Sequence, residues 1–163
     1  MKYKMIECGA YLRVVAIKSF GGIQEGEEGG LIAKEANLSQ EGNAWVSRDA
    51  QVYGNARVSG DAWVFGDAQV SGDAWVFGDA WVFEHAQVSG DARVSKTPIN
   101  ILGLRWAVTI SDHHIQVGCE LHLKAEWATF EEERIAHMDG EALEFWNEHR
   151  GTILKLAGVE QKL

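Results

Sequence analysis

Apolar and polar residues follow a six-residue period from Gly42 to Ser95, written as nine hexads such as GDAWVF. The third position is always Ala and the fifth is always Val: Ala44, Ala50, Ala56, Ala62, Ala68, Ala74, Ala80, Ala86 and Ala92, with Val46, Val52, Val58, Val64, Val70, Val76, Val82, Val88 and Val94. A period of six is typical of a short strand followed by a tight Gly-Asp or Gly-Asn turn. Because one such unit cannot bury its apolar residues alone, we expect the hexads to stack as a parallel β-solenoid with Ala and Val inside.

A second period, of 18 residues, appears in the residue that precedes each Val. Every third hexad carries the same kind of side chain there, which gives three columns: Trp45, Trp63 and Trp81; Gln51, Gln69 and Gln87; Arg57, Trp75 and Arg93. Eighteen residues should therefore make one turn with three faces. The sequence predicts a three-sided prism of three regular coils, each rising about 4.8 Å.

The column of tryptophans predicts an apolar outer face. Phe65 and Phe83 follow Val64 and Val82, so they should point outward beside Trp45, Trp63 and Trp81. Five large aromatic side chains exceed the apolar surface that a monomer normally exposes. Three occupants of this face stay open: a second copy of the chain, the chain's own terminal segments, or a ligand or foreign partner.

The residues on either side of the repeat predict two further parts. We expect a small N-terminal cap at 1–30, the β-solenoid at 31–96 and an α+β domain at 97–163. In the last part, 104–111 and 114–118 are predicted as strands. A helix is predicted from Lys124 to Met138, with Trp127, Phe130, Ile135 and Met138 as its apolar stripe. Asp139 is the expected N-cap of a final helix.

The hexads resemble the left-handed parallel β-helix of hexapeptide-repeat proteins. The segment from Ser19 to Val46 is similar to the one that leads into the repeat in proteins carried by bacteria, phages and prophages, some described as putative acyltransferases or polymer-forming proteins. LRWAVTISDHHIQVGCELHLKAEWATF and MDGEALEFWNEHR resemble parts of small phage proteins. The resemblance implies inward positions for Ile32 and Leu38 in an irregular first coil. It also implies a homotrimer, whose contact would include Trp45, Trp63, Phe65, Trp81 and Phe83.

One histidine of the repeat is a candidate catalytic base. Hexapeptide acyltransferases typically use a His as general base and bind coenzyme A between neighbouring prisms. His85 replaces the usual Asp or Asn of its hexad, and Glu84 replaces the usual Gly. A Glu-His pair can act as a base, but variation of the turn is the preferred explanation. The nine hexads contain no long inserted loop of the kind these acyltransferases carry, which counts against catalysis.

A second group of reactive side chains lies beyond the repeat, at His113, His114, Cys119 and His122. Imidazole and thiolate groups at short spacing can bind zinc. This spacing matches no established zinc finger, and alternation along a strand would separate some of these side chains. We therefore expect no metal and no other cofactor. His113 and His114 remain candidates for contact with a ligand.

The third face of the predicted prism carries the candidate ligand site. Arg57, Trp75 and Arg93 fall in one column. An Arg beside a Trp can hold a planar anionic group through charge and stacking. In a trimer this column could line a groove for a small anionic or nucleotide ligand.

Composition narrows the function further. The chain has a formal net charge of −9 and no cluster of Lys and Arg, which argues against binding to a nucleic-acid polymer. Cys8 and Cys119 make no disulfide framework. No signal peptide and no apolar run of membrane-spanning length are apparent, so a cytoplasmic protein is expected. The expected function is a non-catalytic binding protein, plausibly phage-encoded, such as a counter-defence sponge for a nucleotide-type signal. An acyltransferase and a structural assembly module are the alternatives.

Overall fold

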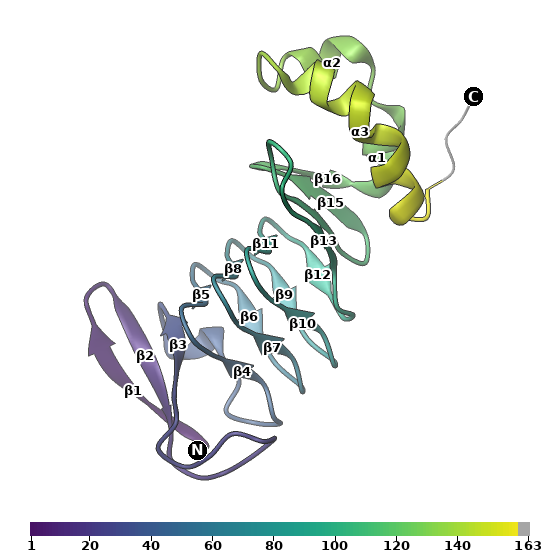
Figure 1. Cartoon of the computed structure of the whole chain (residues 1–163). Helices are drawn as coiled ribbons and strands as arrows, with labels where there is room; N and C mark the ends of the chain where they lie inside the picture. The colour runs from purple at the N-terminus through teal and green to yellow at the C-terminus, as the bar shows by residue number, and fades with distance from the viewer. Residues whose placement is uncertain (160–163) are drawn as a thin grey trace. The chain divides into compact units, whose positions relative to one another are not determined.

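The structure is a computed structural model that describes residues 1–159. The chain forms two compact units, Met1–Pro98 and Ile99–Leu163 (Figure 1). The first unit contains the repeat. The second unit contains a small sheet and the helices.

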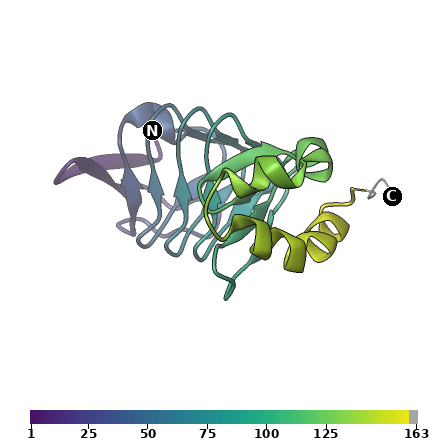
Figure 2. The same ribbon diagram turned by 90° about the horizontal axis from the view of Figure 1, so that it is seen from above.

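Each of the nine hexads contributes one two-residue strand. The strands are β4 (Trp45–Val46), β5 (Gln51–Val52), β6 (Arg57–Val58), β7 (Trp63–Val64), β8 (Gln69–Val70), β9 (Trp75–Val76), β10 (Trp81–Val82), β11 (Gln87–Val88) and β12 (Arg93–Val94). Strands three hexads apart pair in parallel, so Trp63 lies in register with both Trp45 and Trp81. The three predicted columns are thus confirmed as three sets of paired strands. They form a β-solenoid of about 4 turns (Figures 1 and 2).

The core of the solenoid is the pair of invariant columns. Every Val and every Ala of the hexads is at most 2% exposed. Because Val is β-branched and Ala is small, the two columns fill a narrow interior without voids. The side chains on either side of each Val remain outside, as the hexad pattern predicts.

The corners of the solenoid require an unusual backbone conformation. The first residue of each of the nine hexads has a positive φ, and seven of these nine residues are Gly. The two exceptions are Arg48, with φ 58°, and Glu84, with φ 54°. Both belong to the corner that Gly66 also occupies, 18 residues from each. A left-handed conformation costs a non-glycine residue about 1–2 kcal/mol, so this corner is strained at two of its three levels.

The N-terminal segment extends the sheet that carries the glutamines. Strands β1 (Tyr3–Cys8) and β2 (Tyr11–Ala16) form an antiparallel hairpin, β2 pairs with β3 (Glu28–Ile32), and β3 pairs in parallel with β5. Ile32 lies in register with Val52, and Leu38 forms a bridge with Val58. Both side chains are at most 1% exposed, which confirms that they point inward.

Side chains replace the missing strands at this end of the solenoid. Asn37, in the 3₁₀ helix Glu35–Asn37, donates from Nδ2 to the carbonyl oxygen of Ala56 at 2.7 Å. Tyr3 donates from its hydroxyl to the carbonyl oxygen of Leu38 at 2.6 Å. The Lys2 ammonium donates to the carbonyl oxygens of Glu41, Gly42 and Ala44, at 3.2, 3.1 and 2.7 Å. These contacts close the first coil.

Lys2 should make the stability of the first unit depend on pH. Burial lowers its pKa from 10.5 to about 8, an effect that the Asp61 carboxylate opposes and Lys18 reinforces. Between these two pH values the unfolded chain binds more protons than the folded chain, so raising the pH favours folding. We expect the free energy of unfolding to rise by about 1 kcal/mol between pH 8 and pH 9.5. Urea unfolding at both pH values measures this rise. Lys2→Met should abolish it, and an equal rise in that variant would show that Lys2 is not its cause.

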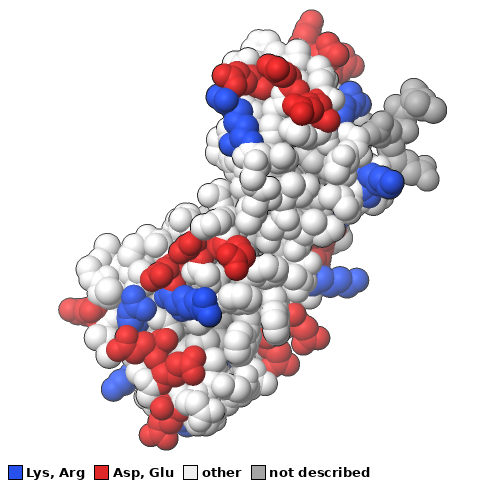
Figure 3. All heavy atoms as spheres, in the orientation of Figure 1, with Lys and Arg blue, Asp and Glu red and all other residues white. Residues whose placement is uncertain are grey.

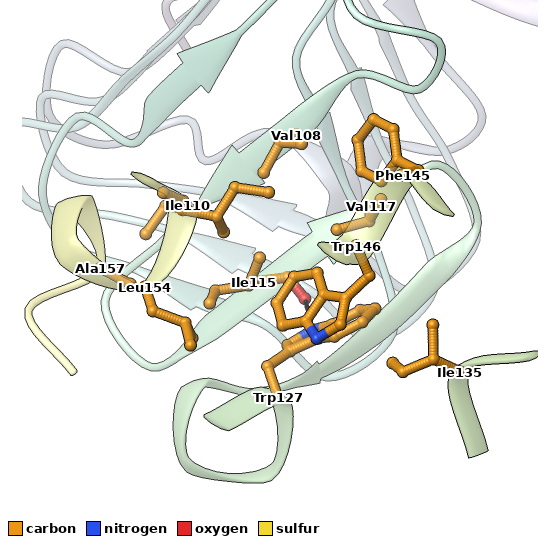
Figure 4. Close-up of a cluster of buried hydrophobic side chains, with 11 residues drawn as sticks. Val108, Ile110, Ile115, Val117, Trp127, Ile135, Phe145, Trp146, Leu154 and Ala157 are labelled. Atoms are coloured by element: carbon orange, nitrogen blue, oxygen red, sulfur yellow. Dashed lines mark hydrogen bonds between the residues drawn. The ribbon is translucent and has the colours of Figure 1, made fainter. Parts of the chain in front are cut away.

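The second unit is a four-stranded antiparallel sheet with three helices. The strands, in sheet order, are β13 (Ile99–Ile101), β14 (Val108–Ile110), β15 (His114–Val117) and β16 (Glu120–Leu123). The helices are α1 (Lys124–Thr129), α2 (Glu132–Ala136) and α3 (Ala142–Leu156). Trp127, Phe145 and Trp146 from the helices pack with β14 and β15 residues in one apolar core (Figure 4).

Three predictions for this unit are wrong in detail. The strand expected over 104–111 is confined to β14, and β13 and β16 were not predicted. The helix expected from Lys124 to Met138 breaks at Phe130, whose ψ of 128° is extended. The break leaves the Phe130 ring 5.4 Å from Trp127 and 4.9 Å from His122. The last helix is capped by Glu141 rather than Asp139, although Asp139 Oδ1 accepts from the Glu141 amide at 3.0 Å.

Candidate functional site

Arg57, Trp75 and Arg93 line one open groove on the solenoid. They come from β6, β9 and β12, which pair with the three residues in register. The groove has a volume of about 510 Å³, and Asn55 and Asp73 complete its lining. We call these five residues the arginine groove. The 18-residue period predicted the three residues that define it.

The Trp75 ring is held at the centre of the arginine groove. Its Nε1 donates to Ser59 Oγ at 2.8 Å, and the Phe77 ring lies 4.7 Å away, centre to centre. The Arg93 guanidinium lies 5.2 Å from the centre of the Trp75 ring. Trp75 remains 37% exposed, so one side of this ring is available to a ligand.

The charge of the arginine groove is positive but local. It contains two guanidinium groups and one carboxylate, Asp73, which accepts from Asn55 Nδ2 at 3.1 Å. On the face of the molecule shown in Figure 3, Lys and Arg side chains are interspersed with Asp and Glu side chains. The positive charge is therefore confined to the groove itself.

A second surface is formed by Trp63, Phe65, Trp81 and Phe83, which we call the aromatic row. The Trp63 and Trp81 rings stack at 5.9 Å, and the Phe65 and Phe83 rings stack at 5.4 Å. Trp81 is 50% exposed and the other three are half-buried. Arg48, Glu27 and Glu28 lie around the same hollow in the surface. The aromatic row is therefore an apolar strip with a charged border.

The prediction that Trp45 belongs to this exposed surface is wrong. Its side chain is 0% exposed. The rings of Tyr3 and Phe20 contact it edge-on, at 6.4 and 5.4 Å between centres. Gly29 lies against it so closely that a Cβ there would be 2.7 Å from the indole. The N-terminal segment thus covers one end of the tryptophan column and leaves Trp63 and Trp81 in the open part.

His85 lies at an exposed corner of the solenoid. Its Nδ1 is 3.5 Å from Asp67 Oδ2, and both side chains are more than 60% exposed, at 63% and 62%. The neighbour Glu84 has the left-handed conformation that Gly adopts in most other hexads. A turn variant accounts for both residues, while the contact with Asp67 is the one feature that a catalytic base would share.

The structure separates the candidate metal ligands of the second unit. His122 pairs with Ile115 across β15 and β16, so it lies on the opposite face from His114. Its Nε2 contacts the Glu120 carboxylate at 2.9 Å. Cys119 is exposed in the turn between these strands, and His113 precedes β15. Among residues 1–159, no three His, Cys, Asp or Glu side chains gather in a way that could hold a metal ion.

Sequence reasoning missed a pocket in the second unit. Trp106, Trp127, Phe145 and Trp146 line it together with Glu120 and Asp139. The sequence places these residues up to 40 positions apart, from Trp106 to Trp146, without any repeat that relates them. The abundance of tryptophan in this part of the chain was the available signal.

The repeat and its pairing define the class: the chain is a β-solenoid repeat protein. Residues 50–66, 68–84 and 86–96 match the family described as YdcK Beta solenoid repeat. No curated protein matches the chain. Within the described residues 1–159, no helix has the length and apolar character that crossing a membrane requires.

Proposed function

We propose that this protein is a non-catalytic binding protein that holds a small planar anion in the arginine groove. The observation that carries the proposal is the Arg93 guanidinium over the half-open Trp75 ring, with Arg57 in the same column. Two positive charges beside an exposed indole match a phosphate or carboxylate attached to a flat ring system. A nucleotide-type molecule has this chemistry.

The proposal includes the finer architecture. The solenoid is a left-handed, three-sided prism, and three copies assemble around an axis. The hexad pattern and the three sets of strands per turn support the prism. The aromatic row supports assembly, because its stacked rings lie at the surface and a head-to-tail contact that closes into a ring of three would remove them from water. A second copy then covers Trp63, Phe65, Trp81 and Phe83.

The biological role proposed is sequestration. The resemblance of the segments around the repeat to phage and prophage proteins suggests a phage-encoded protein of the bacterial cytoplasm. A protein that binds a nucleotide-type host signal without altering it would act as a counter-defence sponge. The open groove supports reversible capture, since its ligand would need no enclosed active site.

Native mass spectrometry of the protein purified from cells is the first test. A trimer that carries additional mass, released as a nucleotide-type molecule on denaturation, is the expected result. Titration with AMP and with a cyclic dinucleotide follows on ligand-free protein. A bare monomer that binds neither probe would overturn both the assembly and the ligand site.

Arg57→Ala combined with Arg93→Ala should weaken binding of the captured molecule, or of the probe that binds, at least tenfold, because each charged contact contributes about 1.5–3 kcal/mol. Lys4→Ala with Lys96→Ala is the matched control. Both lysine side chains are exposed and lie outside the groove, and their replacement removes two positive charges, as the arginine variant does. Isothermal titration of the two double variants measures the difference. Equal weakening in both would show that only net charge matters.

An acyltransferase is the second candidate function, favoured by the contact between His85 and Asp67. It predicts turnover of acetyl-CoA that is lost in His85→Ala, whereas a sponge releases its ligand unchanged. A structural assembly module, the third possibility, would bind neither ligand nor coenzyme and would depend on the aromatic row alone.

A further inference from the structure

The second unit contains a pocket in which four of the twelve lining residues are aromatic, and we call it the aromatic pocket. Its walls include Trp106, Trp127, Phe145 and Trp146, and its volume is about 100 Å³. Neither the repeat nor the arginine groove contributes to it. This volume is smaller than that of an engineered cavity of about 150 Å³ that holds benzene, so the aromatic pocket can enclose only part of a small organic molecule.

The walls of the aromatic pocket are held in place before any ligand binds. Trp127 donates from Nε1 to the carbonyl oxygen of Ile115 at 2.8 Å, a contact drawn in Figure 4. The Trp127 and Trp146 rings lie 4.8 Å apart, and Trp106 meets Phe145 edge-on at 5.0 Å. Trp127 and Trp146 are each 3% exposed, whereas Trp106 is half-buried. Because the rings are packed on both strands and helices, little side-chain entropy remains to be lost on binding.

The charged groups of the aromatic pocket are all acidic. Glu120 and Asp139 line it, and among its described lining residues there is no Lys, Arg or His. The Glu120 carboxylate is oriented by His122 Nε2 at 2.9 Å, and Asp139 Oδ1 by the Glu141 amide at 3.0 Å. These two carboxylates disfavour an anion and favour a cation. The Arg105 guanidinium lies 5.1 Å from the centre of the Trp106 ring, but its charge is paired with the Glu141 carboxylate. The electron-rich faces of indole and phenyl rings attract a cation in the same way.

We propose that the aromatic pocket binds a small alkylammonium cation, with the alkyl groups against the indole rings and the charge near Glu120 and Asp139. Indole is the best of the natural side chains for this contact, and three of the four aromatic walls are indoles. The methyl groups of an alkylammonium cation would also fill space that a bare metal ion would leave empty. The ligand is thus opposite in charge to that of the arginine groove.

The test compares choline with 3,3-dimethylbutan-1-ol, its neutral analogue of the same shape. Titration of the full chain, followed by NMR of the tryptophan indole N–H signals, should show saturable binding of choline. The alcohol should bind at least tenfold more weakly. Equal affinity for the two compounds, or no shift with either at millimolar concentration, would overturn the proposal.

Two variants assign the site. Trp106→Leu, at the half-buried wall, should abolish choline binding, and Glu120→Gln should weaken it severalfold. Glu132→Gln removes the same charge from an exposed position of α2 outside the pocket and should leave the affinity unchanged. The combined Arg57→Ala and Arg93→Ala variant should also bind choline normally, so failure of the arginine groove and failure of the aromatic pocket are distinguishable. Choline binding that survives Trp106→Leu and Glu120→Gln would place the cation elsewhere.

Discussion

Trp45→Ala is expected to lower the free energy of unfolding of the Met1–Pro98 unit by about 3–5 kcal/mol. Its ring is fully buried, and Tyr3 and Phe20 contact it, so truncation leaves a cavity under the N-terminal segment. The matched variant is Trp81→Ala, in the same column of the repeat but with a side chain that is 50% exposed. Trp81→Ala loses its ring contacts with Trp63 and Phe65 and should cost the isolated chain only about 1 kcal/mol.

Trp81→Ala, which has the smaller effect on stability, should have the larger effect on assembly. If copies of the chain meet at the aromatic row, Trp81→Ala removes part of the contact and shifts the trimer toward monomer. Sedimentation velocity over a range of concentrations measures the assembly, and hydrogen exchange of the Ser47 and Phe65 amides, which bond to the next turn, measures local stability. If Trp81→Ala forms the trimer as readily as the wild type, the aromatic row is not the contact between subunits.

Gly72→Val is expected to destabilise the solenoid by about 3 kcal/mol. Gly72 has φ +66°, a conformation that costs a β-branched residue more than most. A Cβ at this position would also lie 2.8 Å from the carbonyl oxygen and 2.9 Å from the amide nitrogen of Gly90 in the next turn. Backbone atoms cannot move aside without breaking the contact between turns, so strain and overlap add.

Glu84→Gly tests the same reasoning in the opposite direction. Glu84 has φ 54°, and Gly relieves that strain at some cost in unfolded-chain entropy. The net gain should be about 0.5–1 kcal/mol. Urea unfolding of both variants against the wild type provides the measurement. If Gly72→Val did not destabilise the solenoid, or if Glu84→Gly did, the positive φ at the corners would not be the reason that Gly recurs there.

The repeat could be predicted from sequence because its period is a direct record of its geometry. Val52 and Val70 recur 18 residues apart since they lie one above the other in paired strands. The same register brings Arg57, Trp75 and Arg93 together. For these residues the 18-residue spacing is enough to predict which side chains lie next to one another on a sheet, even though each strand has only two residues.

Outside the repeat no such period exists, and prediction was correspondingly weaker. Trp45 and Trp63 occupy the same position of their hexads. Trp45 is buried because Tyr3 and Phe20 contact it, and the path of these two residues depends on the hairpin and the loop after it. The break at Phe130 follows from its packing with Trp127 and His122 rather than from a Gly or Pro. The aromatic pocket depends on contacts of α1 and α3 with the turn between β15 and β16 and with Trp106, which lies before β14, and local patterns do not specify these contacts.

The 18-residue register also determines how such a protein can change its length. Removing or duplicating residues 60–77, one full turn, would keep Trp, Gln and Arg positions on their own sheets and alter the height of the solenoid by about 4.8 Å. Gain or loss of a single hexad would instead move every later strand to the next sheet. The residues of the aromatic row and of the arginine groove would then no longer lie side by side. Evolution can therefore adjust the reach of this scaffold in whole turns while every remaining column stays on its own sheet.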